Sequence, residues 1–320
     1  MDAAGVDVDG VVGLSGAIDG VWPQARLAGA ADGTHHQVGI VPSGSGDRII
    51  AGARLAWRGP MAKLPTGEVF PNPTVDKVIF QIRFPSLFFL ENRVGDFQLE
   101  IITRFPESEL RLQRSVVFAH GADPDVIAKQ LPDTDSTTRI WVFSNPAGVV
   151  VELKNDSLTI MTRRHKSYKT GEECFRDVVA FVLERLRKVV PIPVATRLGL
   201  RYTDRCPVPE FTTAKVTEYY NSTLPLARFP VEGIQGEMTT RVVTAVGTNR
   251  RLQYIERLQP PDSEGEARLI LDFDASAENL KPDEIMGVTD ELHAVIRTAF
   301  ESTIKEPVVE WMRAQPGEAQ

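Results

Sequence analysis

The chain has 320 residues, of which 42% are hydrophobic, so it holds enough apolar material for one large domain or two smaller ones. Its formal net charge of -7 excludes a protein whose surface as a whole attracts nucleic acid or anionic lipid. Two cysteines cannot build a disulfide framework, and no basic leader or long apolar run is present, which predicts a cytoplasmic protein without a membrane span.

The first 70 residues differ in composition from the rest. They contain 13 of the 24 glycines and few long apolar side chains. Such a segment buries too little surface to offset the entropy of ordering its backbone, so we predict a flexible extension that folding does not require. One strand or helix fits residues 47–57. His35 and His36 lack further ligands nearby, which favours a solvated loop over a metal site.

Regular structure is expected from residue 71, after the turn Pro71-Asn72-Pro73. The predicted elements are a strand at 75–84, a helix at 94–105, a turn at 120–124 with a short helix at 126–127, strands at 139–144, 149–153 and 157–162, a helix at 175–189 and a strand at 196–205. The three middle strands are joined by tight turns and form a meander. Thr170 and Glu173 make a capping box before the helix at 175–189. His120 has no nucleophile near it in sequence, so we interpret it as a loop residue rather than a catalytic one.

The second half follows the same plan. Its predicted elements are a helix at 215–221, strands at 236–246, 251–258 and 267–274, and a long helix at 292–304. Each half therefore reads as a meander followed by a helix. The sequence predicts an α+β protein with two antiparallel sheets, each covered by amphipathic helices, and three regions: the extension 1–70, a first half 71–210 and a second half 211–320.

Several short motifs occur in an order typical of one family. They are VIFQIRFP at 78–85, FQ at 97–98, FP at 105–106, WVFS at 141–144, the segment 158–168 with Phe175, and RLGLRY at 197–202. From about residue 73 onward the chain resembles a sporadically distributed family of uncharacterised bacterial proteins, although that family usually lacks the basic run at 163–166. The resemblance implies a fold and no established activity. A patchy distribution implies an accessory or defence gene set.

The strand at 196–205 is unusually charged. Arg197 and Arg201 leave one face about 13 Å apart with Gly199 between them, while Leu198 and Tyr202 leave the other. These arginines, with Tyr202 and Asp204, could hold an anionic ligand, because a guanidinium matches phosphate or carboxylate. The alternative is structural pairing with acidic side chains of a neighbouring strand, and carboxylates on both guanidiniums would indicate it. We expect the structural role for Arg197 and the binding role for Arg201.

A basic run at 163–166 precedes Tyr168. The basic side chains could contact phosphates while a base stacks on the tyrosine, which would suit nucleic acid. The alternative is that these residues simply form a solvated turn, as such residues usually do. A metal-independent ribonuclease would need His165 or His120 as its base, with Tyr168 or an arginine in support.

Two further features carry alternatives. Asp272 and Asp274 lie about 6–7 Å apart on one strand face and could share a divalent ion, or pair with the arginines of the charged strand. Cys174, in the predicted first helical turn, would be reactive if the helix N-terminus lowered the pKa of its thiol, and is otherwise an inert interface residue.

No cofactor is expected from these patterns. We predict a binding or interaction protein without enzymatic activity, working with a protein partner or an anionic small ligand, and neither nucleic acid nor a membrane is the expected partner. The alternative is an enzyme or binder that acts on a phosphorylated or nucleic-acid ligand through Arg197, Arg201, His165 and Tyr168.

Overall fold

The computed structural model describes residues 62–65, 67–114, 137–263 and 265–315, all within the unit that spans Ile50–Gln320. Several predictions fall outside these residues. They are the body of the Gly-rich extension, the pair His35 and His36, the element at 47–57, and the turn and short helix at 120–127.

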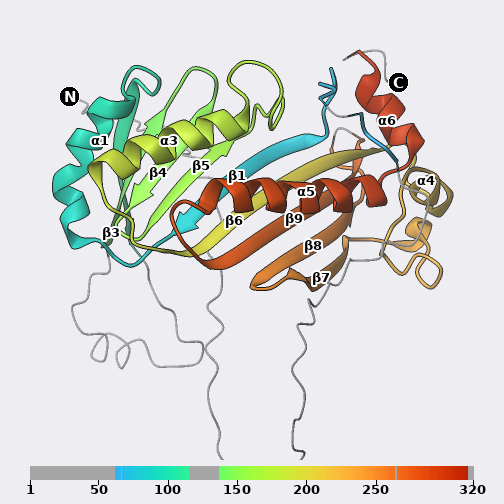
Figure 1. Cartoon of the computed structure of the whole chain (residues 1–320). Helices are drawn as coiled ribbons and strands as arrows, with labels where there is room; N and C mark the ends of the chain where they lie inside the picture. The colour runs from blue at the N-terminus through green and yellow to red at the C-terminus, as the bar shows by residue number, and fades with distance from the viewer. Residues whose placement is uncertain (1–61, 66, 115–136, 264, 316–320) are drawn as a thin grey trace, which may run out of the picture. The chain divides into compact units, whose positions relative to one another are not determined.

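In the described part of the chain, nine strands form a single antiparallel sheet in the order β2-β3-β4-β5-β1-β6-β9-β8-β7 (Figure 1). The strands are β1 (Val75–Arg83), β2 (Glu107–Arg114), β3 (Thr137–Ser144), β4 (Val149–Lys154), β5 (Ser157–Thr162), β6 (Ala195–Val208), β7 (Met238–Gly247), β8 (Arg250–Gln259) and β9 (Ala267–Leu280). The predicted α+β class with antiparallel pairing is confirmed. The predicted division into two sheets is wrong, because β1 pairs with both β5 and β6, and β6 pairs with β9.

Helices cover one face of this sheet. The helical elements are η1 (Phe88–Arg93), α1 (Val94–Ile101), α3 (Phe175–Val189), α4 (Thr213–Tyr219), η2 (Val231–Gly233), α5 (Ile285–Thr303) and α6 (Glu306–Arg313). Figure 1 shows α3 and α5 lying across the sheet, α3 over the strands of the first half and α5 over β6, β9 and β8. Each buries an apolar stripe, such as Val178, Val182 and Leu186 on α3.

The two halves share one order of elements. In the first, β1 is followed by α1, the strands β2 to β5 and then α3, and in the second, β6 is followed by α4, the strands β7 to β9 and then α5. In each half the first strand pairs with the last strand of its own meander, as β1 does with β5 and β6 with β9. The first strands then pair with each other in the middle of the sheet.

The core lies between the sheet and these helices. Phe80, Phe97, Leu200 and Phe273 are fully buried there. Ile82, Phe143, Phe175, Val179, Leu198 and Ile296 are also buried, whereas Trp141 and Phe300 are partly buried at the margin of the core. Because side chains alternate along a strand, the opposite face of β6 carries Arg197, Gly199 and Arg201.

A buried carboxylate anchors the segment that follows α4. Glu256 on β8 is completely buried and accepts hydrogen bonds from Ser222 Oγ at 2.5 Å, Thr223 N at 2.7 Å and Thr223 Oγ1 at 2.6 Å. The hydroxyl of Tyr254 donates a further bond at 3.1 Å. These donors compensate the carboxylate for lost hydration and fix the segment to the sheet.

The residues that precede β1 form a strap, here residues 62–65 and 67–73, on α5 and α6. The Ala62 amide donates to Glu301 O at 3.1 Å, Arg297 Nη2 donates to Leu64 O at 2.5 Å, and the Asn72 amide donates to Met312 O at 3.1 Å. Ala62 and Leu64 therefore belong to the packed structure, although they precede the boundary at residue 70 that composition suggested.

Candidate functional site

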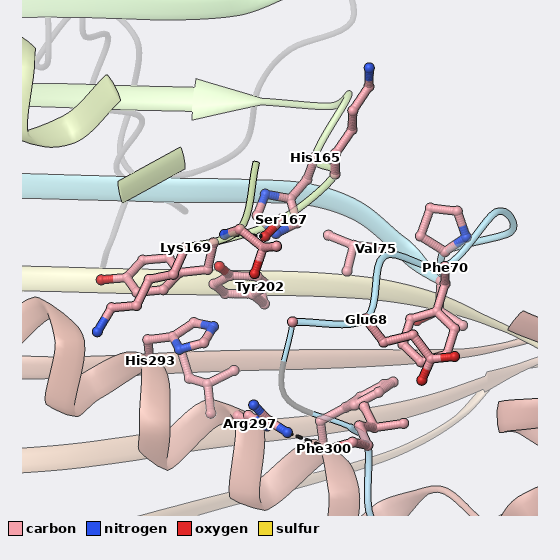
Figure 2. Close-up of a pocket in the computed structure, with 18 of the residues that line it drawn as sticks. Glu68, Phe70, Val75, His165, Ser167, Lys169, Tyr202, His293, Arg297 and Phe300 are labelled. Atoms are coloured by element: carbon pink, nitrogen blue, oxygen red, sulfur yellow. Dashed lines mark hydrogen bonds between the residues drawn. The ribbon is translucent and has the colours of Figure 1, made fainter. Parts of the chain in front are cut away.

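A cavity of about 390 Å³ lies between the strap, the loop of residues 163–174, the C-terminal half of β6 and helix α5. Figure 2 shows His165 and Ser167 on the loop side, His293, Arg297 and Phe300 on α5, Glu68 and Phe70 on the strap, and Tyr202 in the middle. Its volume falls in the range of about 300–1,000 Å³ that is usual for small-molecule pockets.

The hydroxyl of Tyr202 is the most unusual group in the cavity wall. Tyr202 is 6% exposed, and its Oη has no hydrogen-bond partner among the described residues. A buried tyrosine hydroxyl normally finds a partner, because leaving it unsatisfied costs about 1–3 kcal/mol. Burial also raises the pKa of Tyr202 well above its ordinary value, so this hydroxyl stays protonated and can donate.

His165 packs against Tyr202 in the wall of the cavity. The two rings meet edge to face with centroids 5.3 Å apart. His165 Nδ1 is buried without a hydrogen-bond partner in the described part of the chain. Burial lowers the pKa of His165 to about 4, so its ring is neutral at pH 7. Together the two side chains offer hydrogen-bonding atoms that the protein itself leaves unused.

Stacked rings form another part of the wall. The Tyr168 ring lies on the His293 ring with centroids 3.8 Å apart and an interplanar angle of 9°. Burial is the main reason that the pKa of His293 falls to about 4, so this imidazole is also neutral. Phe70 and Phe300 line the same cavity. Flat apolar surfaces of this kind suit a ring-shaped molecule.

Asp290 on α5 holds the 163–174 loop in place. Its carboxylate accepts hydrogen bonds from Tyr168 Oη at 2.8 Å and from Nε and Nη2 of Arg176 at 2.8 and 3.0 Å. It also forms an ion pair with Lys169 Nζ at 3.3 Å. Although burial opposes it, these partners lower the pKa of Asp290. The loop, α3 and α5 are thereby joined, which fixes this side of the cavity.

Asp204 lies two residues beyond Tyr202 on the same face of β6 and also lines the cavity. It is 2% exposed, and Thr74 Oγ1 donates to its Oδ1 at 2.8 Å. Burial raises the pKa of Asp204 to about 7, and the nearby carboxylates of Asp272 and Asp76 push it in the same direction. A carboxyl this deep normally has a cation or several donors beside it.

The two arginines of β6 lie on the other face of the sheet, away from the cavity. Arg201 Nε and Nη2 bind the two oxygens of Asp272 at 2.7 and 2.5 Å, and Arg197 Nη2 lies 3.4 Å from Asp274 Oδ1. The predicted pairing of the acidic strand with the charged strand is confirmed. Carboxylates occupy both guanidiniums, Arg201 included, which is the arrangement that indicates a structural role.

Position 199 must be a glycine because the Arg197 side chain packs against its backbone. A Cβ at this position would lie 2.6 Å from Arg197 Nη1, so the guanidinium rests directly on the bare backbone. The space that the sequence suggested for a ligand between the two arginines is thus filled by Arg197 itself. Asp272 and Asp274 are engaged by the arginines, and the described residues contain no group of three or more His, Cys, Asp or Glu side chains placed to hold a metal ion.

The start of α3 differs from prediction. The capping box of Thr170 and Glu173 is not formed, because Cys174 is the N-cap residue and Glu173 adopts a positive φ of 56°. The amides of Phe175 and Arg176 donate to Ser167 O and Tyr168 O instead. Burial raises the pKa of the Cys174 thiol, which favours the inert interface residue over the reactive thiol.

The basic run does not form one patch. Arg163 pairs with Asp76 at 3.4 Å, and Arg164 Nη1 donates to Pro146 O at 3.3 Å, whereas His165 turns into the cavity. Of the six predicted ligand residues, the cavity brings together His165, Tyr168, Tyr202 and Asp204 and leaves out Arg197 and Arg201.

Sequence reasoning missed the part of the site that α5 and the strap supply. Asp290 and His293 follow the spacing of an ordinary amphipathic helix, and Thr74 stands at the start of a strand, so no local signal marks them. In the described residues no helix is both long and apolar enough to cross a membrane. Comparisons of the chain with known protein families, with curated proteins and with solved structures find no match.

Proposed function

We propose that this protein binds a small ring-containing molecule in the cavity between β6, α5, the strap and the 163–174 loop. The observation that carries the proposal is the Tyr202 hydroxyl, which is buried, protonated and without a partner among the described residues. A ligand that accepts a hydrogen bond would satisfy it, and the neutral His165 can serve the same ligand.

The proposal agrees with the prediction of a binding protein without enzymatic activity. The alternative was a protein that acts on a phosphorylated or nucleic-acid ligand through Arg197, Arg201, His165 and Tyr168. It has less support, because the two arginines lie on the opposite face of the sheet from His165 and Tyr168 and bind carboxylates. Membership of the sporadic bacterial family, a cytoplasmic location and a protein partner stay predictions.

Ligand-detected NMR with a panel of single-ring compounds tests the proposal, using benzyl alcohol, benzylamine, benzoate and phenol as probes. We expect at least one compound to bind saturably and to be displaced by another. The variant Ala294→Trp should abolish this binding, since Ala294 is exposed on α5 at the rim of the cavity and a large ring there fills the opening.

Thr298→Trp is the matched control. Thr298 is exposed one turn further along α5 and does not line the cavity, so binding should persist. The proposal fails if no compound binds the unmodified chain, or if Ala294→Trp and Thr298→Trp bind equally well. Thermal melts of both variants verify that each is folded.

A further inference from the structure

The carboxyl of Asp204 raises a separate question about the cavity. Among the described contacts, one hydrogen bond reaches it, from Thr74 Oγ1 at 2.8 Å. An aspartate that is 98% buried would ordinarily be paired with a cation or hydrogen-bonded by several donors. Glu256 in the same sheet shows what the fold supplies when a buried carboxylate is structural, namely four hydrogen bonds.

Two of the basic side chains that line the cavity are engaged by other groups. Lys169 pairs with Asp290 at 3.3 Å, and Arg297 binds Glu301 Oε1 at 2.7 Å and Leu64 O. The charged groups that act most strongly on Asp204 are carboxylates, those of Asp76 and Asp272. Asp272 is itself paired with Arg201 and Asp76 with Arg163, and none of the described groups that act on the pKa of Asp204 is a cation.

Aromatic side chains line the same cavity as the Asp204 carboxyl. Tyr202 precedes it on the same strand face, at a spacing of about 6–7 Å between alternate residues, and Phe70 and Phe300 line the same space. Ring faces attract an organic cation as well as an apolar ring. A carboxylate next to aromatic faces is a common arrangement for holding an amine.

We infer that the cavity recognises a small organic cation, an amine carried on a ring, with the ammonium group on Asp204 and Thr74 and the ring among Tyr202, Phe70 and Phe300. The inference rests on the proposed function and names its ligand class. An ammonium has three donors, which supply the hydrogen bonds that the carboxylate otherwise lacks.

Isothermal titration calorimetry with three probes of equal shape tests the charge preference. Benzylamine is cationic, benzyl alcohol is neutral and benzoate is anionic at pH 8. We expect benzylamine to bind at least tenfold more tightly than benzyl alcohol, and benzoate to bind weakest. In Asp204→Asn, benzylamine should fall to the affinity of benzyl alcohol, whose own affinity should change less than twofold.

Asp76→Asn is the matched control, because Asp76 acts on Asp204 electrostatically but does not line the cavity. This variant should keep the preference for benzylamine. Equal binding of all three probes, or tightest binding of benzoate, overturns the cation inference and leaves the proposed function standing. If none of the probes binds, both fail.

The pH dependence of the unmodified chain gives a second measurement. Charged and titratable groups near Asp204 are Asp76 on β1, Asp272 on β9, His165, Lys166 and Lys169 on the loop, Asp290, His293 and Arg297 on α5, and Glu68 on the strap. Both histidines have a pKa of about 4 and do not titrate between pH 6 and 8. Because Asp204 ionises at about pH 7, benzylamine affinity should rise about tenfold over this range, and a flat profile overturns the inference.

Discussion

Replacing Asp204 by asparagine should make the protein more stable at neutral pH. The side chain is 2% exposed, and burial raises its pKa from 3.8 to about 7. At any pH between these two pKa values, the Asp204 carboxyl is ionised in the unfolded chain and protonated in the folded chain. The free energy of unfolding therefore falls as pH rises from about 4 to about 7 and stays low above that.

The size of the effect follows from the two pKa values. The difference between 3.8 and about 7 corresponds to about 4 kcal/mol, as an upper limit. Asparagine is neutral at every pH, and its side-chain oxygen can still accept the hydrogen bond from Thr74 Oγ1. The variant should thus gain up to about 4 kcal/mol relative to the unmodified chain between pH 4 and pH 8.

Urea unfolding followed by tryptophan fluorescence at several pH values measures this difference. Burial lowers the pKa of His165 and of His293 to about 4. Their contribution to the free energy of unfolding is therefore lost as pH falls from 6.5 towards 4, a pH dependence opposite in sign to that of Asp204. They are present in both proteins, so their effect cancels in the difference. A difference that stays constant from pH 4 to pH 8 would refute the reasoning, since it would mean that Asp204 titrates alike in both states.

Two other substitutions test the polar contacts of the sheet. Glu256→Ala leaves four donors without their acceptor in a fully buried position and should lower the free energy of unfolding by about 3–5 kcal/mol in urea titrations, and a loss below about 1 kcal/mol would contradict a structural role. Arg201→Ala should cost about 3 kcal/mol because it isolates the Asp272 carboxylate, whereas exchanging both residues for leucine should recover most of the loss. If the double variant is as unstable as the single one in thermal melts, the ion pair is not what stabilises this face.

Local patterns predicted the elements well where one periodicity dominates. Helix α3 runs over the predicted residues 175–189, because its apolar side chains lie on one stripe. Strand β2 was missed because its two leucines, Leu110 and Leu112, are exposed and its remaining side chains are polar, as suits an outer strand. The single sheet was missed because alternation in β1 identifies a strand without naming its partners.

The residues that β6 contributes to the candidate site could be predicted from the sequence, whereas those that α5 contributes could not. Tyr202 and Asp204 were identified on the charged strand, but together with Arg197 and Arg201, which lie on the other face of the sheet. His293 comes from α5, more than ninety positions further along the chain, and nothing in its local spacing separates it from a helix surface. Tertiary packing alone brings the two together.

The position of β1 in the middle of the sheet has a consequence for synthesis on the ribosome. Its partner β6 begins about 110 residues later, so at translation rates of about 5–20 residues per second the nascent strand waits roughly 6–20 s for it. During this interval the backbone edge of β1 that β6 will cover is open, and one face of the strand presents the apolar side chains of Val78, Phe80 and Ile82. An apolar strand with a free edge is a template for wrong pairing, so this interval is when the emerging chain is most exposed to mispairing of β1.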